Sequence, residues 1–409
     1  MTRYVLLVAS SCCGLACGDP LYPPSDDPVP TDAPLQVGTP APAPCRVGAE
    51  DPTSLVVTTT DFATGAITVV GPDGVVTPDV AVGSPDAIPY PAPGGVAVVH
   101  RFGYDFIDVL EDSSWRSLGQ HALAAPDADS PNPHAVVFDD DGMGYVTLFG
   151  SASMLVFDPA APPGEAVVDS IDLAPFADAD GRPEASLEVR CGDTLWVSVE
   201  RLDVPGGYRR TGEEMMVAID LRSRVPYDFD ADRAGGQGLP LQGAWLKQLR
   251  RDPAEPTAVL GLTSGIERID LGALHSEWLV GPEAFADAGI EHYQQPLSFD
   301  VDPTGQRIWI AAYLPAAPTD CTRDPSECFD HAQLFEVDLT AAQPVLEPFG
   351  APFEAVDRTL ERVGDTLWVG SRQSDAPGLY RYDLTTQPPT LRDGPLSTGL
   401  APYSITAVP

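Results

Sequence analysis

Basic residues are scarce in this chain of 409 residues, and lysine is almost absent. The chain has 23 lysines and arginines against 60 aspartates and glutamates, so its formal net charge is −37, and lysine occurs once, at Lys247. Such a charge repels the phosphates of nucleic acids and anionic lipid headgroups. We therefore expect no nucleic-acid partner.

Helical periodicity and familiar catalytic motifs are also missing. No Gly-x-Ser-x-Gly, phosphate-binding loop, dinucleotide fingerprint or His-Glu-x-x-His motif occurs. The apolar stretch at residues 4–16 is too short to span a bilayer. These absences argue against an α-helical fold and against the best-known hydrolase and nucleotide-binding chemistries.

An internal repeat is the main positive signal. The hexapeptide Gly-Asp-Thr-Leu-Trp-Val occurs at residues 192–197 and again at 364–369. Looser copies form seven pairs of apolar segments, and the alternation of apolar and polar residues in them is typical of strands with one covered face. The first segments are 55–57, 96–98, 145–146, 195–197, 259–260, 308–310 and 367–369, and the second segments are 67–69, 106–109, 154–158, 216–220, 266–270, 334–338 and 379–383.

A further strand, usually after a proline, is expected before most pairs, as at 85–88, 132–136, 183–187 and 296–299. The chain ends on another copy at 402–408, and the first pair lacks one. We predict an all-β fold over residues 51–409. It is a seven-bladed β-propeller of four-stranded antiparallel blades, closed by the C-terminal strand joining the N-terminal blade.

This organisation resembles the seven-bladed propellers of the YVTN-repeat and lactonase-like group. Blades of that group carry a proline, an apolar strand, an Asp-Gly-type turn, Tyr-Val or Trp-Val and a Val-Asp strand, and here Tyr145-Val146-Thr147-Leu148 occupies the place of the tetrad. The group includes enzymes and binding proteins, so the resemblance implies a fold more than an activity. By analogy with lactonase-type propellers, it implies a channel metal with Asp86, Glu184, Glu188 and Asp300 as candidate ligands.

The N-terminus carries export signals. Arg3 precedes the apolar stretch, and Leu15-Ala16-Cys17 resembles a bacterial lipobox in which Cys17 would be lipidated. Residues 1–17 are thus expected to be a lipoprotein signal peptide, and the proline-rich residues 18–50 a disordered tether. The protein would be exported and lipid-anchored in a bacterial cell envelope; ordinary secretion, or lipidation at Cys12, is the alternative.

Four of the seven cysteines remain after removal of the signal and lipidation of Cys17. An even number in an exported protein indicates two disulfides, with three connectivities open. Cys321 and Cys328 share a short loop and are the favoured pair, which leaves Cys45 for Cys191. A cysteine metal site is less favoured, because no paired Cys-x-x-Cys occurs.

In such blades the loop entering the innermost strand and the loop between the second and third strands emerge on one face, which we call the entry face. His134, Glu184 and Asp86 are the candidate catalytic residues there, with His100 nearby, although loop histidines are more often solvated. The longest insertions, 200–214 and 311–332, also fall on this face. The expected partner-binding residues are Arg201, Arg209, Arg210, His292, His331 and Tyr403.

Two aspartate runs, at 178–181 and 228–232, offer oxygen ligands for calcium, but neither completes a calcium-binding loop and solvated turns are the better interpretation. Trp196, Trp309 and Trp368 share one strand position, which favours packing between blades over a quinone-cofactor stack. No cofactor is expected, with calcium or another divalent metal left open.

The leading hypothesis is a monomeric, membrane-tethered lipoprotein whose propeller is a non-catalytic binding or scaffold module for an envelope protein or glycan. The alternative is a metal-dependent hydrolase or lactonase-like enzyme with its site at the mouth of the central channel.

Overall fold

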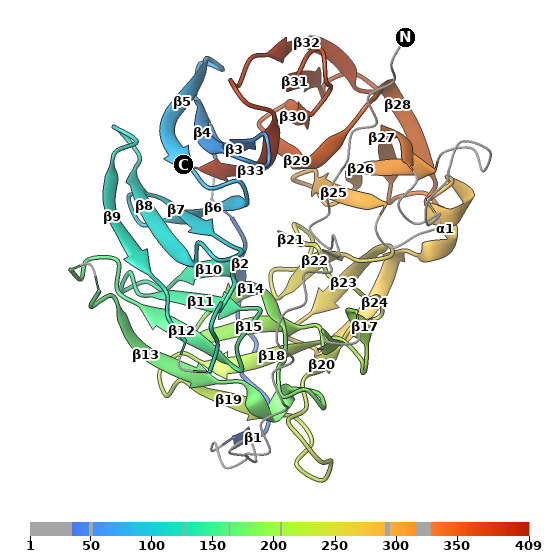
Figure 1. Cartoon of the computed structure of the whole chain (residues 1–409). Coiled ribbons are helices and arrows are strands. Elements are labelled where there is room, and N and C mark those ends of the chain that lie inside the picture. Colours follow the sequence, from blue (N-terminus) through green and yellow to red (C-terminus); the bar gives the residue numbers. More distant parts are fainter. Residues whose placement is uncertain are drawn as a thin grey trace.

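The computed structural model describes residues 35–48, 52–125, 127–162, 164–204, 207–290, 295–315 and 329–408. These residues are almost entirely strands and turns, with one short helix, α1 (Pro282–Asp287), and a 3-10 turn at Ala174–Phe176. Small antiparallel sheets follow one another around a centre in chain order (Figure 1). The fold is therefore all-β and propeller-like, as the sequence predicted.

Four separate four-stranded sheets are present, where the sequence predicted seven. In each, the strands pair antiparallel in chain order, and the first strand lies nearest the centre (Figure 1). They comprise β6 (Ala87–Ala92), β7 (Gly95–His100), β8 (Phe106–Glu111) and β9 (Ser117–Ala122); β10 (Pro133–Phe138), β11 (Gly144–Leu148), β12 (Ser153–Phe157) and β13 (Val167–Asp172); β21 (Gln248–Arg251), β22 (Ala258–Leu262), β23 (Ile266–Asp270) and β24 (His275–Val280); and β25 (Pro296–Val301), β26 (Arg307–Pro315), β27 (Phe329–Asp338) and β28 (Leu346–Phe353).

The two ends of the described chain meet in an eight-stranded sheet. One half of it is β29 (Val356–Val363), β30 (Thr366–Ser371), β31 (Gly378–Asp383) and β32 (Thr390–Leu396), and the other is β33 (Pro402–Val408), β3 (Ser54–Thr60), β4 (Gly65–Val70) and β5 (Val76–Gly83). β33 pairs antiparallel with β3, from Ser54 opposite Val408 onward. The predicted pairing of the C-terminal strand with the first strands is therefore confirmed.

The remaining strands form a seven-stranded sheet and a hairpin. The sheet contains β14 (Ala185–Cys191), β15 (Thr194–Val199), β18 (Met215–Asp220) and β19 (Val225–Asp228), extended by β1 (Gln36–Val37), β2 (Cys45–Arg46) and β20 (Leu239–Pro240). The hairpin, β16 (Leu202–Asp203) and β17 (Arg209–Arg210), lies in the predicted insertion at 200–214. The innermost strands contact one another in the order β6, β10, β14, β21, β25, β29, β33 and back to β6.

The repeated hexapeptide builds the same turn and strand twice. Gly192 and Gly364 adopt φ values of 61° and 58°, a left-handed conformation that suits glycine, and β15 and β30 begin two residues later. Trp196 and Trp309 are buried in cores shared by neighbouring sheets, and Trp368 is buried in a core between the two halves of the eight-stranded sheet. The predicted packing role of these tryptophans is confirmed.

Residues 35–48, which we call the N-terminal arm, lie along the seven-stranded sheet. β1 pairs with the outer strand β19, and β2 pairs with the innermost strand β14. Cys45 forms a disulfide with Cys191, as predicted. The sequence assigned residues 18–50 to a tether, so the arm is the part of that region that the structure places against the sheets.

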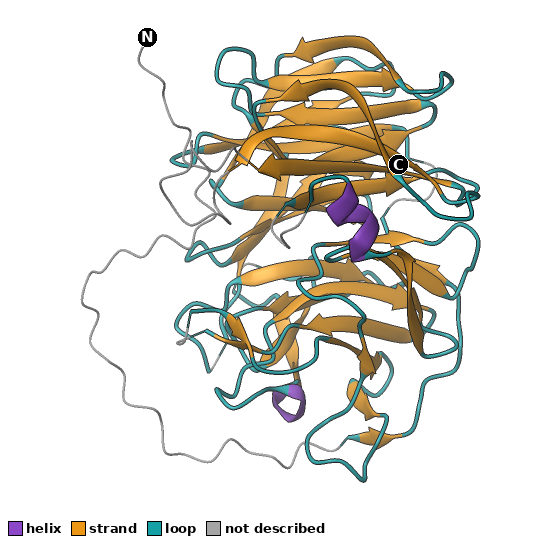
Figure 2. Cartoon of the chain, turned by 90° about the vertical axis from the view of Figure 1, so that its right-hand side faces the viewer, coloured by secondary structure: helices purple, strands orange, loops and turns teal. Residues whose placement is uncertain are grey.

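Several sequence predictions fall outside the described residues: the signal peptide, Cys17, His292, and the Cys321–Cys328 pair. Within the described ranges, no helix is long and apolar enough to cross a membrane. In the side view of Figure 2, strands make up the body of the molecule and loops cover both of its faces.

Candidate functional site

The innermost strands bring the predicted site residues toward the centre of the ring on the entry face. Asp86 and Glu184 directly precede β6 and β14, while His134 and Tyr403 are the second residues of β10 and β33. The labelled strands surround the centre in Figure 1. The structure joins Asp86 to Tyr403 and gives His134 and Glu184 separate partners.

Asp86 is held in a buried ionic cluster. Its Oδ1 accepts hydrogen bonds from Arg101 Nη2 and from the Tyr403 hydroxyl, each at 2.5 Å. The Arg101 side chain is 5% exposed and that of Asp86 is 18% exposed. Although burial acts to raise it, Arg101 and the Tyr403 hydroxyl hold the pKa of Asp86 below its ordinary value. Asp86 is therefore the ionised counterion of Arg101.

His134 and His100, both on the entry face, are neutral at neutral pH. The ring of His134 stacks on Phe149 at 4.6 Å, and its carbonyl accepts the Tyr90 hydroxyl at 2.7 Å. Burial, aided by the positive charges of Arg101 and Arg358, holds the pKa of His134 well below its ordinary value. His100 is 1% exposed and its Nδ1 lies 2.9 Å from Ser84 Oγ, and burial lowers its pKa to about 4.

Glu184 and Glu188 are buried carboxyl groups. Oε2 of Glu184 accepts the Leu202 N–H at 2.8 Å, whereas its Oε1 has no partner among the described residues. Burial raises the pKa of Glu184 to about 8 and that of Glu188 well above its ordinary value. Glu184 is therefore largely protonated at neutral pH, a form that binds cations weakly, and burial shifts the pKa of Glu188 in the same direction.

The predicted channel metal has no ligand set in the described part of the chain. Asp300 accepts the Arg362 N–H at 2.6 Å and lies 3.9 Å from Arg250 Nε, in a pairing that is separate from Asp86. Across the described ranges, no three His, Cys, Asp or Glu side chains lie together in a way that could hold a metal ion. Asp86, Glu184, Glu188 and Asp300 thus do not converge.

The aspartate runs serve as turns. Asp228 Oδ1 accepts the backbone N–H groups of Asp230 and Gln237 at 3.2 and 3.0 Å. Asp178 Oδ1 accepts the Asp180 N–H at 3.0 Å. Carboxylates that cap their own loops in this way have a structural role.

The predicted partner-binding residues divide into two groups. Arg209 and Arg210 are exposed on the hairpin, where Arg209 lies 3.7 Å from Asp203. His331 lies in β27, with its Nδ1 2.9 Å from Asp330. Tyr403, by contrast, belongs to the buried Asp86 cluster, and Arg201 is mostly covered beside Gly212.

Two cations at the axis were not predicted from the sequence. Arg358 in β29 is exposed, and Lys247 precedes β21 and donates from Nζ to the Pro296 carbonyl at 2.6 Å. Burial and the charge of Arg358 lower the pKa of Lys247 to about 7. The uniqueness of Lys247 was a usable signal, whereas nothing in the sequence distinguishes Arg358 from the other arginines.

Backbone strain is concentrated on the entry face. Left-handed backbone is unfavourable for residues other than glycine, and bulky residues seldom adopt it. Three bulky residues nevertheless have a positive φ and are also exposed: Phe62, Phe102 and Tyr208, with exposed fractions of 41%, 50% and 36%. Eight of the twelve non-glycine residues with positive φ in the described chain lie in entry-face loops: Phe62, Phe102, Asp105, Asn132, Glu184, Arg201, Tyr208 and Trp245.

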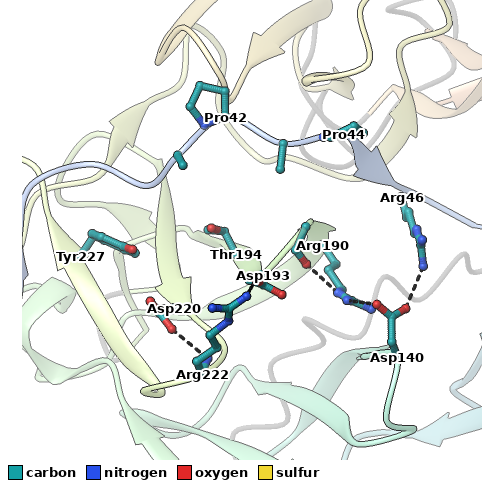
Figure 3. Close-up of a pocket in the computed structure, with 13 residues that line it drawn as sticks. Pro42, Pro44, Arg46, Asp140, Arg190, Asp193, Thr194, Asp220, Arg222 and Tyr227 are labelled. Carbon is teal, nitrogen blue, oxygen red and sulfur yellow. Dashed lines mark hydrogen bonds and ion pairs between the residues drawn. The ribbon is translucent and has the colours of Figure 1, made fainter.

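A pocket of 480 Å³ lies at the end of the seven-stranded sheet that is away from the entry face, beneath the N-terminal arm (Figure 3). Five of its charged side chains form ion pairs: an Asp140 oxygen lies 2.9 Å from Arg46 Nη1, the other lies 2.6 Å from Arg190 Nη2, and Arg222 pairs with Asp193. Each of these arginines therefore already has an acidic partner within the protein.

No protein-family model and no curated protein matches this sequence. Among solved structures, the chain is similar to hydrazine synthase of Kuenenia stuttgartiensis, with 12% identity, a TM-score of 0.48, and coverage of 79% of this chain and 86% of that one. It is also similar to a catalytically inactive virginiamycin B lyase from Staphylococcus aureus, with 10% identity, a TM-score of 0.46, and coverage of 80% and 94%. A third similar structure is the dihydro-heme d1 dehydrogenase NirN, with 12% identity, a TM-score of 0.45, and coverage of 90% of this chain and 79% of that one. Similarities of this size carry no argument about activity.

Proposed function

We propose that this protein is a binding module of a bacterial envelope, in which a seven-bladed propeller takes a protein or glycan partner on its entry face. The N-terminal region, lipidated at Cys17, would tether it to the membrane. Support for seven blades comes from the order of contacts among the seven innermost strands and from the two four-stranded runs that make up the eight-stranded sheet.

The observation that carries the proposal is the set of exposed aromatic side chains in strained loops of the entry face. Phe62 follows β3, Phe102 follows β7, and Tyr208 lies in the hairpin beyond β15. Aromatic residues contribute strongly to protein interfaces, and these side chains keep an exposed surface even where they pack within the fold, as the Phe62 ring does on the Arg372 guanidinium at 4.4 Å. Binding accounts for both their exposure and their strain.

Site-specific photocrosslinking tests the proposal. A photoreactive phenylalanine analogue placed at Phe102 in the full-length protein should give discrete adducts in envelope fractions. The matched control is the same analogue at Leu118, which is 56% exposed on the outer strand β9. An excess of unmodified protein should suppress the adducts, and an excess of the Phe62→Ser/Phe102→Ser variant should not. Equal labelling from both positions, or none, would contradict an entry-face binding role.

A further inference from the structure

Arg358 is an exposed guanidinium at the start of an innermost strand. It lies in β29, and its backbone pairs in parallel with Ser404 of β33, next to Tyr403 of the Asp86 cluster. No hydrogen bond or ion pair within the described ranges involves its side chain, whereas Arg101, Arg250 and Arg372 nearby all have several.

The charge of Arg358 reaches groups on most sides of the ring. It acts on side chains from the innermost strands or entry-face loops of several other sheets. Arg358 lies on the innermost strand β29, which contacts the innermost strands β25 and β33 on either side, and this central place brings its charge close to these groups. Closeness matters because Coulomb interactions weaken with distance and with screening by solvent. The affected groups outside β29 are Asp86, Tyr90, His134, Glu200, Lys247 and Tyr403.

The acidic side chains around Arg358 form no ion pair with its guanidinium within the described ranges. Asp86 is already the counterion of Arg101. Burial raises the pKa of Asp357 above its ordinary value and that of Glu200 to about 7, so Glu200 carries less than a full charge at neutral pH. Arg358 is therefore an exposed cation without an ion-pair partner in the described part of a chain whose formal charge is −37.

We propose that the entry-face axis binds the carboxylate group of an anionic ligand, with the Arg358 guanidinium as its main contact and Lys247 beside it. The proposal rests on the proposed function and names the chemistry of the ligand. A guanidinium matches the two oxygens of a carboxylate in bidentate geometry. A single negative charge fits better than a phosphate dianion, because Asp86 stays ionised close by and would repel the second charge.

Lys247 is a built-in reporter, because it is the only lysine in the chain. Full-length protein labelled with [13Cε]lysine should give one lysine resonance, with a pKa of about 7 in chloride buffer. Saturating N-acetylglycine should raise that pKa by about one pH unit, since a bound carboxylate offsets the charge of Arg358. N-acetylglycinamide, the neutral analogue, should leave it unchanged.

Variants separate this site from general salt effects. Arg358→Gln should raise the pKa of Lys247 without any probe and remove the response to N-acetylglycine. Arg116→Gln, at an exposed arginine of the β8–β9 turn, should change neither. An unchanged Lys247 titration in wild type, an equal response to N-acetylglycinamide, or an equal response in Arg358→Gln would overturn the proposal.

Two further probes identify the source of the carboxylate. A response to acetate as strong as that to N-acetylglycine assigns the site to small organic acids, and a stronger response to N-acetylglycine assigns it to a peptide terminus. A response to phosphate larger than to either would overturn the choice of a carboxylate. Crosslinking from Phe102 does not depend on Arg358, so entry-face binding can hold even if the anion site fails.

Discussion

The entry-face axis and the pocket beneath the N-terminal arm differ in how their charged and polar side chains are paired. Under the arm, Arg46 and Arg190 share Asp140, whose side chain is 66% exposed. At the axis, Glu184 Oε1 and Asp86 Oδ2 are buried without hydrogen-bond partners in the described structure. The axis also holds Arg358, which has no ion pair in the described part of the chain.

The ion pairs under the arm have an ordinary structural role, whereas the unpaired polar groups at the axis are not explained by a contribution to stability. Exposed ion pairs cost little to form and contribute little. Buried polar atoms without partners destabilise a fold, and ligand binding is one explanation for those at the axis, although such atoms also occur elsewhere, as at Trp309 and Glu336. The strained loops above the axis indicate the same end of the ring.

The largest contrast is expected from removing one counterion in each region. Asp86→Asn leaves Arg101 charged and buried, and should lower the free energy of unfolding by about 3–5 kcal/mol. Asp193→Asn removes the exposed partner of Arg222 and should cost less than about 1 kcal/mol. Urea unfolding of both variants measures the difference, and equal losses would show that the axis cluster is no more desolvated than the surface.

The next contrast is in pH dependence. Glu184 has a folded-state pKa of about 8 against an ordinary value of 4.5, so the folded state retains a proton that the unfolded state loses. Stability should therefore fall as pH rises from about 4.5 to 8. Glu184→Gln, which keeps an acceptor for the Leu202 N–H, should remove this loss and be more stable than wild type at pH 8 by about 2–4 kcal/mol.

Urea unfolding of wild type and Glu184→Gln at intervals from pH 4.5 to 8.5 tests this. The two curves should agree at the acid end and separate as pH rises. Parallel curves would mean that Glu184 ionises in the folded protein as it does in the unfolded chain.

The sequence predicted the sheets because their signals are local. Alternating residues, turn glycines and the repeated hexapeptide report on a few neighbouring positions, and the C-terminal strand was assigned to the first sheet because that sheet lacked one. The Cys45–Cys191 disulfide was predicted by elimination among four cysteines. Each of these inferences needed only spacing and residue type.

The site was less predictable because it depends on which side chains meet across the ring. Asp86 was chosen as a catalytic or metal residue, yet the structure pairs it with Arg101, which was not singled out. Glu184 and Glu188 were chosen as metal ligands, but burial raises the pKa of both carboxyl groups. Arg358 was missed because its significance lies in the absence of a partner, which no sequence pattern records.

The smallest expected effect comes from the two copies of the hexapeptide, which are identical in sequence but differ in surroundings. Ala at Gly192 or Gly364 should cost about 1–2 kcal/mol, because both glycines have left-handed backbone. A Cβ at Gly364 meets no atom within 4 Å, whereas one at Gly192 would lie 2.7 Å from the Cβ of Ala43 in the arm. Gly192→Ala should therefore cost about 1 kcal/mol more than Gly364→Ala.

The disulfide provides the control for this comparison. Ala43 lies two residues from Cys45, so the Cys45–Cys191 bond limits how far the arm can move away from the added methyl group. In a Cys45→Ser/Cys191→Ser background, the arm can shift and the two alanine variants should become equally destabilising by urea unfolding. A difference that persists there would mean that β1 and β2 hold the arm without the disulfide, because the clash would then remain in the absence of the covalent link.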